Sequence, residues 1–232
     1  MVIYVRFIPF GGGQIGGSAY YLELDGFHFL IDAGSHPGKQ QRKSDFHGLA
    51  RLAGLKSATD LDAVFITHGH LDHVGGLLDL LTQAPQLPVY FHPHTGRIAR
   101  ALFERTPGIK DPFSRMKGYH RFLAAQESNA SHDYDRPFYP AEGVRQAPVE
   151  VTFLSAGHIP GSACIRFRGA QGTVMVTGDF NDASTLFLTG TRSNPAFDEL
   201  PLDLLIAEGT YAGRWPSSGP GCLLYTSDAA DE

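Results

Sequence analysis

The chain has 232 residues with a formal net charge of −5, and 42% of the residues are hydrophobic, which describes a globular protein with a substantial core. No stretch approaches the roughly 18 consecutive apolar residues that a membrane span requires, and residues 1–10 lack the basic start and apolar core of a signal peptide. These features exclude the transmembrane and secreted classes, so we expect a cytoplasmic protein with no membrane partner.

The first predicted elements are strands separated by glycine turns, over residues 2–34, followed by a helix over residues 44–54. Asp32 ends an apolar strand in the sequence FHFLIDAG. An aspartate between a strand and a glycine is commonly a turn residue. The residues around Asp32 do not by themselves distinguish a turn from a functional carboxylate.

The next elements are a short buried strand over residues 61–67 (LDAVFIT) and a helix over residues 74–82. Between them, the sequence HGHLDH places three histidines and an aspartate within six positions. Histidines near a helix start can be caps or surface residues. Four ligand residues at this spacing instead favour a site for two metal ions.

The spacing divides the four ligands into two pairs. His68 and His70 lie two positions apart on an extended loop, so their side chains point to the same side and can bind one ion. Asp72 and His73 open the helix and face another way, where they can hold a second ion. The Asp72 carboxylate also gains from the positive end of the helix dipole. Imidazole nitrogen together with carboxylate oxygen suits zinc best.

Residues 89–104 predict a strand that leads into a helix, and residues 105–148 predict one helix near 113–127 within a proline-rich surface insertion. Between positions 97 and 121 there are seven basic residues and two acidic ones. A phosphate backbone would favour such a face, but a solvated helix face explains the same charges. The basic residues are Arg97, Arg100, Arg105, Lys110, Arg115, Lys117 and Arg121.

Three further candidates follow apolar strands in the second half of the chain. His158 lies in SAGHIPGSA, where Gly157 and Gly161 allow a tight loop, and Asp179 lies in TVMVTGDF. Glu208 follows an apolar run in LLIAEGTY and has the alternative interpretation of a carboxylate that caps a turn. Sites in open α/β sheets form beyond the carboxyl ends of strands, so one rim could gather these side chains.

The HGHLDH motif, followed by GHIPGSA and TGDF, resembles the metallo-β-lactamase superfamily. GHIPGSA and LLIAEGTY resemble its β-CASP group of nucleases, although Gly209 stands where that group usually has serine. The resemblance implies an α/β (α+β) fold, a four-layer αββα sandwich that is incomplete on its C-terminal side. It also implies two zinc ions that hydrolyse phosphodiester bonds of RNA, or of DNA, by activating water and neutralising the developing charge.

The resemblance assigns roles to individual residues. His68, His70 and His158 would hold one zinc ion, Asp72 and His73 the other, and Asp179 both. The second site would be incomplete in this fragment, because the histidine that completes it in the β-CASP group would lie beyond it. Asp32 would orient a metal-binding imidazole, and Glu208 would orient a catalytic histidine of the β-CASP domain. The expected catalytic residues are therefore Asp72, Asp179 and Glu208, with metal ligands at His68, His70, Asp72, His73, His158 and Asp179.

The C-terminal residues 222–232 (CLLYTSDAADE) resemble a translated sequencing adapter, and a natural polar C-terminus is the alternative. We therefore expect residues 1–221 to form the N-terminal part of a metallo-β-lactamase domain without a β-CASP domain. Such a fragment of an RNA-processing, exonuclease-like enzyme would be a poor catalyst. Cys164 and Cys222 are too few and too far apart for a disulfide framework.

Two other functions stay open at this point. One is hydrolysis of a small thioester, as in hydroxyacylglutathione hydrolases, which share HxHxDH but lack EGTY. The other is a metal-binding scaffold without catalysis, although every expected ligand within the chain is present. A diiron redox centre is disfavoured because such proteins place glutamate where this chain has His70. The sequence does not fix the oligomeric state.

Overall fold

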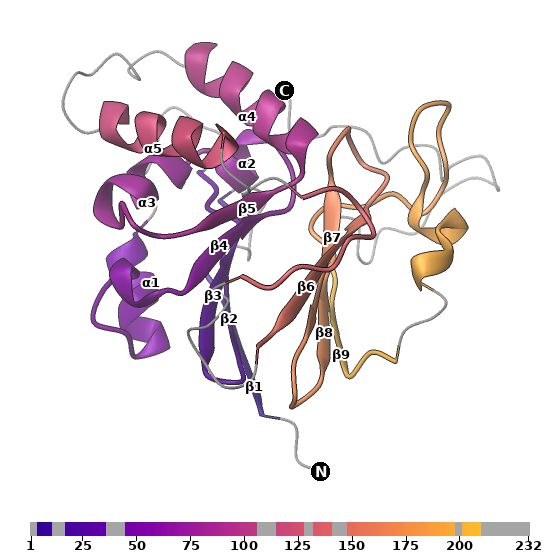
Figure 1. The fold of residues 1–232 in the computed structure, drawn as a ribbon, viewed down its shortest axis with the longest axis horizontal. Coiled ribbons are helices and arrows are strands. Elements are labelled where there is room, and N and C mark those ends of the chain that lie inside the picture. Colours follow the sequence, from indigo (N-terminus) through magenta and orange to yellow (C-terminus); the bar gives the residue numbers. More distant parts are fainter. Residues whose placement is uncertain are drawn as a thin grey trace.

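Two β-sheets face each other, and helices cover the outer face of the first (Figure 1). The computed structural model describes residues 4–10, 17–35, 45–105, 115–127, 132–140, 148–197 and 201–209. The first sheet has the order β1-β2-β3-β4-β5, and its strands are β1 (Val5–Pro9), β2 (Tyr20–Leu24), β3 (Phe27–Ile31), β4 (Ala63–Ile66) and β5 (Val89–Phe91). The second has the order β6-β7-β8-β9, with β6 (Glu150–Ser155), β7 (Ala163–Arg168), β8 (Thr173–Val176) and β9 (Leu204–Ile206).

The direction of the strands places the carboxyl ends of several of them at one edge. β2 and β3 form an antiparallel hairpin whose turn, Asp25–Gly26, has positive φ at both residues, as expected for a two-residue turn of this sequence. β3, β4 and β5 are then parallel, with helices in the connections. The loops that leave β3 and β4 therefore lie next to each other.

The core between the sheets is aromatic. Phe29 of β3 and Phe65 of β4 meet edge to face at 5.4 Å between ring centroids, and both contact Phe167 of β7, at 5.5 and 5.1 Å. All three rings are fully buried. Rings in these arrangements add to the stabilisation from buried apolar area, so the two sheets form one rigid support for the loops above them.

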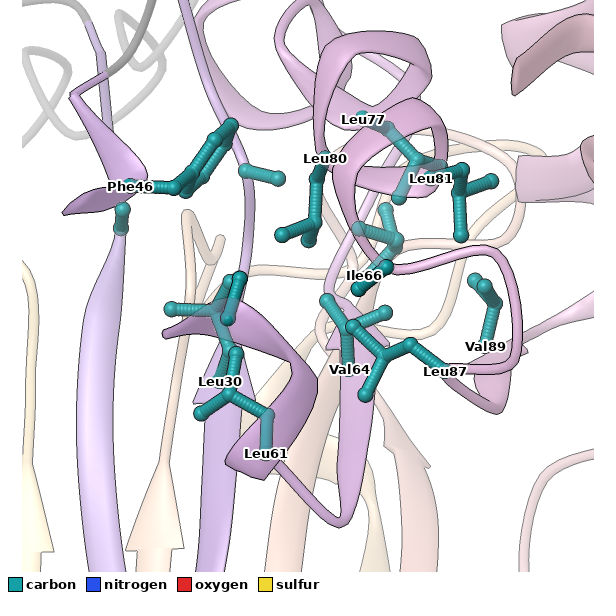
Figure 2. Packing of buried hydrophobic residues seen from close by; sticks show 14 of the residues in the cluster. Leu30, Phe46, Leu61, Val64, Ile66, Leu77, Leu80, Leu81, Leu87 and Val89 are labelled. Carbon is teal, nitrogen blue, oxygen red and sulfur yellow. The ribbon is translucent and has the colours of Figure 1, made fainter. Parts of the chain in front are cut away.

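A second core lies between the first sheet and its helices. Figure 2 shows Leu30, Val64 and Ile66 of the sheet packed beneath Leu77 and Leu80 of a helix. The helices of this layer are α1 (Phe46–Ala53), α2 (Leu71–Val74), α3 (Leu77–Gln83), α4 (Pro93–Arg105) and α5 (Arg115–Glu127), and a 3-10 turn, η1 (Ala58–Asp60), precedes β4.

The interpretation of residues 105–148 as a surface insertion is wrong for its helix. α5 lies at the predicted position, but its Phe122 is 1% exposed and packs against Phe91 and Phe103. A side chain at Gly118 would meet the backbone of Leu78 at 2.1 Å, so only glycine allows α5 to approach α3 this closely. α5 is therefore part of the helical layer.

The outer face of the second sheet has a different cover. Leu154, Cys164 and Met175 are buried there beneath Phe180 and Phe197. In the described residues this cover consists of loops and two 3-10 turns, η2 (Thr191–Ser193) and η3 (Pro195–Phe197). The expected fold class, a mixed α/β fold with two facing sheets, is confirmed, and the described residues supply its helical layer and both sheets.

Most other element predictions need only shifts at their ends. The strand predicted at 61–67 is β4, the helix at 44–54 is α1, and the pair at 89–104 is β5 and α4. The helix predicted at 74–82 begins earlier, as α2, and Gly75 and Gly76 separate it from α3. Among the described residues, no helix combines the length and the apolar character that crossing a membrane would require.

Candidate metal centre

Three imidazoles converge beyond the ends of β4 and β6. The loop after β4 carries His68 and His70, and the loop after β6 carries His158. Nε2 of His68 lies 3.2 Å from Nδ1 of His70, and Nε2 of His158 lies 3.3 Å from the same Nδ1. We call these three histidines the first donor group. The structure thus brings together residues 88 positions apart that the sequence predicted as ligands of one ion.

The separations in the first donor group fit a tetrahedral metal site. With zinc–nitrogen bonds of about 2.0–2.1 Å, two ligand nitrogens of a tetrahedron lie about 3.3–3.4 Å apart. Burial, followed by the neighbouring imidazoles, lowers the pKa of His68 well below its ordinary value. The neutral imidazole that results is the form that binds a metal.

His68 is held in a defined orientation by the residue before it. The Thr67 hydroxyl donates to Asp32, at 2.8 Å from Oδ2, and its oxygen lies 3.1 Å from Nδ1 of His68. An oxygen that donates its proton to Asp32 is an acceptor for the Nδ1 proton of His68. That tautomer leaves the lone pair of Nε2 directed at the other two histidines. Thr67 was not among the predicted site residues, and only its place directly before the motif signals its role.

A second donor group combines His73 and Asp179 with His68. Nε2 of His73 lies 3.3 Å from Oδ1 of Asp179, and Oδ2 of Asp179 lies 3.9 Å from Nε2 of His68. The same Oδ2 lies 4.0 Å from Nε2 of His158. Oδ1 of Asp179 therefore faces His73, and its Oδ2 faces the imidazoles of His68 and His158.

Asp32 fixes the orientation of His73. Its carboxylate is fully buried and accepts from Nδ1 of His73 at 2.7 Å and from the backbone N–H of Thr67 at 2.8 Å. Nδ1 is thereby occupied, and Nε2 of His73 faces Asp179. Asp32 has a positive φ of 61°, a conformation that aspartate adopts more readily than most residues. It is thus a structural anchor directly after β3.

Opposing influences act on the buried pair of His73 and Asp32. Burial lowers the pKa of His73, but the charges of Asp32 and Asp179 outweigh it and raise the pKa well above its ordinary value. Burial raises the pKa of Asp32, while His73 and Thr67 act in the opposite direction. Burial also raises the pKa of Asp179, but hydrogen bonding to His73 and nearby imidazoles leave it lowered.

Asp72 lies at the start of α2, as predicted, with Oδ2 at 3.8 Å from Nε2 of His73. The expected second group contained Asp72, whereas the group that the structure assembles contains His68. Nε2 of His68 has one lone pair and cannot serve two ions. If His68 binds with the first group, Asp72 is the nearby carboxylate that can take its place in the second.

Glu208 lies just after β9, close to Asp179 in the fold. Its Oε1 accepts the backbone N–H of Phe180 at 3.1 Å, and its own N–H donates to Oγ1 of Thr177 at 3.2 Å. The side chain thus holds the loop after β8 through the backbone of Phe180. The rest of the EGTY motif, Thr210 and Tyr211, lies outside the described residues, as do Cys222 and the tail 222–232.

Helix α4 lies beside both ligand-bearing loops. A side chain at Gly69 would meet Ile98 of α4 at 2.7 Å, and one at Gly161 would meet the backbone of Thr95 at 2.5 Å. His94 and Arg97 lie on the same stretch of α4 and are exposed. Of the predicted basic residues, Arg100 pairs with Glu104 at 2.9 Å, whereas Lys110 lies outside the described residues.

Comparisons with known proteins identify the family and the fold. The family described as the metallo-beta-lactamase superfamily matches residues 12–188 of the chain. Solved structures with a similar fold include the MIM-2 metallo-beta-lactamase, with a TM-score of 0.52 and 20% identity over 85% of this chain and 71% of that chain. MEM-A1, a subclass B3 metallo-beta-lactamase from a soil metagenome library, has a TM-score of 0.52 and 14% identity over 89% of this chain and 78% of that chain.

Similarity in sequence extends to nucleases. Ribonuclease TTHA0252 of Thermus thermophilus is 29% identical over 211 residues, which cover 90% of this chain and 44% of the relative. Ribonuclease J2 of Bacillus subtilis is 29% identical over 192 residues, 81% of this chain and 30% of the relative. Integrator complex subunit 11 of Danio rerio is 28% identical over 215 residues, 90% of this chain and 34% of the relative. The expected resemblance to a nuclease group is confirmed, and the chain spans less than half the length of these relatives.

Proposed function

The chain belongs to the metallo-β-lactamase superfamily, and from that membership we propose that it is the metal-binding part of a two-zinc phosphodiester hydrolase that acts on RNA. One observation carries the proposal. The carboxylate of Asp179 lies between a group of three imidazoles and a buried His73, at 3.3 Å from the latter. Such an arrangement suits two adjacent ions that share one carboxylate.

The residues divide between the two ions as follows. His68, His70 and His158 would hold the first ion, and His73 with Asp72 would hold the second, with Asp179 shared. Two zinc ions at this place would supply Lewis acidity toward a phosphoryl oxygen and would lower the pKa of a bound water to near 7. The distances within the first donor group favour zinc over an ion that prefers six oxygen ligands.

The protein's own part in the reaction is to hold these side chains in place. Asp32 keeps Nδ1 of His73 occupied and so presents Nε2 to the site. Glu208 anchors the N–H of Phe180, the residue next to Asp179, and limits movement of the shared carboxylate. This anchoring is the role that we propose for Glu208 in the present chain, in addition to the expected contact with a more distant histidine.

RNA as the substrate is proposed from the named relatives and from α4. Two of the relatives reported above are named ribonucleases. The exposed His94 and Arg97 lie on the helix that contacts both ligand loops, where they could contact the phosphate next to the scissile one. Exonuclease-like activity, a cytoplasmic location and weak catalysis by this chain alone stay predictions.

The first test is to measure bound zinc by mass spectrometry in the purified chain and in its His70→Ala variant. We expect two ions per chain in the wild type and a loss of the first in the variant. RNA, DNA and a thioester are then offered to the zinc-loaded wild type. Hydrolysis of the thioester alone would overturn the nuclease proposal in favour of a small-molecule hydrolase. Absence of bound zinc would overturn the metal assignment itself.

Binding of RNA is tested separately, since the chain could bind RNA without cleaving it. Arg97→Ala should weaken binding of a single-stranded RNA and reduce the slope of log affinity against log salt by about 1, as expected for one lost phosphate contact. Arg51→Ala is the matched control, because Arg51 is exposed on α1, within the same helical layer. Equal binding by both variants would contradict a role for α4.

A further inference from the structure

We infer that Ser162 is a positioning residue that sets the backbone of His158 and thereby the geometry of the first donor group. The inference rests on the proposed function in one respect, the assignment of His158 as a metal ligand. It concerns a residue with no ligand atom in the site. Ser162 is 1% exposed and lies at the end of the loop that His158 begins.

The loop between His158 and Ser162 is a tight turn. The N–H of Ser162 donates to the carbonyl oxygen of Ile159 at 2.9 Å, across Pro160 and Gly161. Gly161 has φ of +90°, and proline followed by a residue with positive φ is the sequence of a type II turn. Before the turn, Gly157 also has a positive φ, of 71°. His158 is therefore held between two fixed backbone segments.

The side chain of Ser162 closes this turn onto the ligand. Its Oγ accepts the N–H of His158 at 3.1 Å and that of Ile159 at 3.2 Å. One hydroxyl oxygen thus receives the two backbone donors on either side of the His158 carbonyl. Because the position of Nε2 depends on this backbone, a change in these two hydrogen bonds acts directly on the 3.3 Å separation from His70.

Ser162 is itself held by the rest of the fold. Its carbonyl oxygen accepts from the N–H of Ala156 at 3.0 Å and from the hydroxyl of Tyr134 at 2.9 Å. The hydroxyl of Thr95, on α4, donates to the carbonyl of the adjacent Gly161 at 2.7 Å. The serine therefore connects the ligand loop to β6, to the segment of Tyr134 and, through Gly161, to the helical layer.

The role of Ser162 differs from that of a residue that only stabilises the fold. If Ser162 only stabilised the whole domain, its substitution would weaken binding of both ions equally. That effect would be the same whether or not His158 is present. A positioning residue acts through His158, so its effect should be confined to the first ion and should disappear when His158 is removed. These two consequences can be measured without any assay of hydrolysis.

The experiment measures the affinity of each ion by titration of the metal-free chain with Co²⁺, whose absorption reports the ligand geometry, and then with Zn²⁺. Ser162→Ala should weaken binding of the first ion about 10- to 100-fold, the range typical of residues that orient a ligand, and should leave the second ion within a few-fold of the wild type. In a His158→Ala background, adding Ser162→Ala should give no further loss.

The matched control is Ser57→Ala. The Ser57 hydroxyl also accepts a backbone N–H, that of Thr59 at 3.3 Å, but it caps the turn η1, before the start of β4 and not after its end. It should leave both metal affinities unchanged. If Ser162→Ala does not yield folded protein, Tyr134→Phe removes the hydrogen bond to the Ser162 carbonyl and should weaken the first ion selectively.

The outcomes separate the inference from the proposed function. If the wild type binds no Co²⁺ or Zn²⁺, the metal assignment fails, and the inference fails with it. If the wild type binds two ions but Ser162→Ala binds the first as tightly as Ser57→Ala does, only the inference is overturned. An equal loss of both ions, or a further loss in the His158→Ala background, likewise overturns it in favour of a general structural role.

Discussion

The two donor groups of the candidate centre use similar side chains but are supported in different ways. The first consists of three imidazoles whose nitrogens face one another at 3.2 and 3.3 Å. The second depends on a buried chain of contacts in which Asp32 holds His73 at 2.7 Å and His73 faces Asp179 at 3.3 Å. Charge is concentrated in the second group, whereas the first is neutral once its histidines are deprotonated.

This difference indicates where folding and metal binding are coupled. Removing a histidine of the first group takes away a ligand and leaves no buried charge without its partner. Removing a carboxylate of the second group leaves the buried His73 without an ion pair, which is costly in a low-dielectric interior. Substitutions in the first group should therefore change metal affinity with little change in the free energy of unfolding. Substitutions of the carboxylates in the second group should change both.

The largest effect is expected from Asp179→Asn, because this carboxylate lies between the two groups. The amide is a weaker ligand, so bound zinc should fall from two ions to one or none per chain, with the remaining ion held at least about 10-fold more weakly. Metal analysis after dialysis measures both quantities. Asp133→Asn, at an exposed aspartate near Arg136, should keep both ions. Two tightly bound ions in Asp179→Asn would remove the basis for a shared ligand.

The second-largest effect is expected from Asp32→Asn, which tests the coupling between folding and metal binding in the second group. Asparagine has the same shape, but its NH₂ group cannot accept a hydrogen bond. The variant therefore loses an acceptor either for Nδ1–H of His73 or for the N–H and hydroxyl of Thr67. We expect a loss of about 2–3 kcal/mol in the free energy of unfolding in urea, together with weaker binding of the second ion.

The matched control for Asp32→Asn is Asp25→Asn. Asp25 also has a positive φ, of 51°, and its carboxylate accepts the N–H groups of Ala170 and Gln171 at 2.6 and 3.1 Å. Asp25 lies before β3 and Asp32 lies after it, at opposite ends of the same strand, so substitution of Asp25 should leave metal binding unchanged. A similar loss of the second ion in both variants would mean that Asp32 acts on the fold alone and not on His73.

The sequence predicted much of the candidate centre because local chemistry and strand order carried the information. HGHLDH follows β4, His158 follows β6 and Asp179 follows β8, so each predicted ligand lies just beyond the end of a strand. The spacing of the motifs does not determine which ligand nitrogen faces which carboxylate oxygen in the folded site. The grouping of His68 with His73 and Asp179 depends on tertiary geometry that a motif does not contain.

The contacts that the sequence did not predict have a physical cause of the same kind. The burial of α5 depends on Gly118 against α3 and on Phe122 against distant rings, and neither contact has a local signal. Thr67, Thr95 and Ser162 support the centre through hydroxyl groups, and threonine and serine are too common for their position to be noticed. Contacts between residues far apart in the chain depend on how the two sheets and the helices pack, which no local sequence pattern specifies.

The smallest effect is expected at His92, which lies outside both donor groups but supports α4. His92 directly precedes α4, and its Nδ1 accepts the N–H of His94 at 3.2 Å, so the ring must stay neutral at this nitrogen. Its ring also stacks on Tyr134 at 4.1 Å. Burial, followed by the charge of His94 and opposed by Asp133, lowers the pKa of His92 to about 4.

The sign of the resulting pH dependence follows from the two states. The pKa of His92 is about 4 in the folded chain, below the value of about 6.5 for an unfolded histidine, so between pH 4 and 6.5 the unfolded state binds more protons. Stability should therefore fall as the pH is lowered through that window, by about 1–2 kcal/mol at pH 5 from this residue.

His92→Asn keeps an acceptor before α4 but does not titrate, so urea unfolding should show that much less loss of stability between pH 7 and pH 5. The exposed His47 on α1 supplies the control, His47→Asn, which should behave as the wild type does. An unchanged loss in His92→Asn would mean that α4 does not depend on a neutral His92.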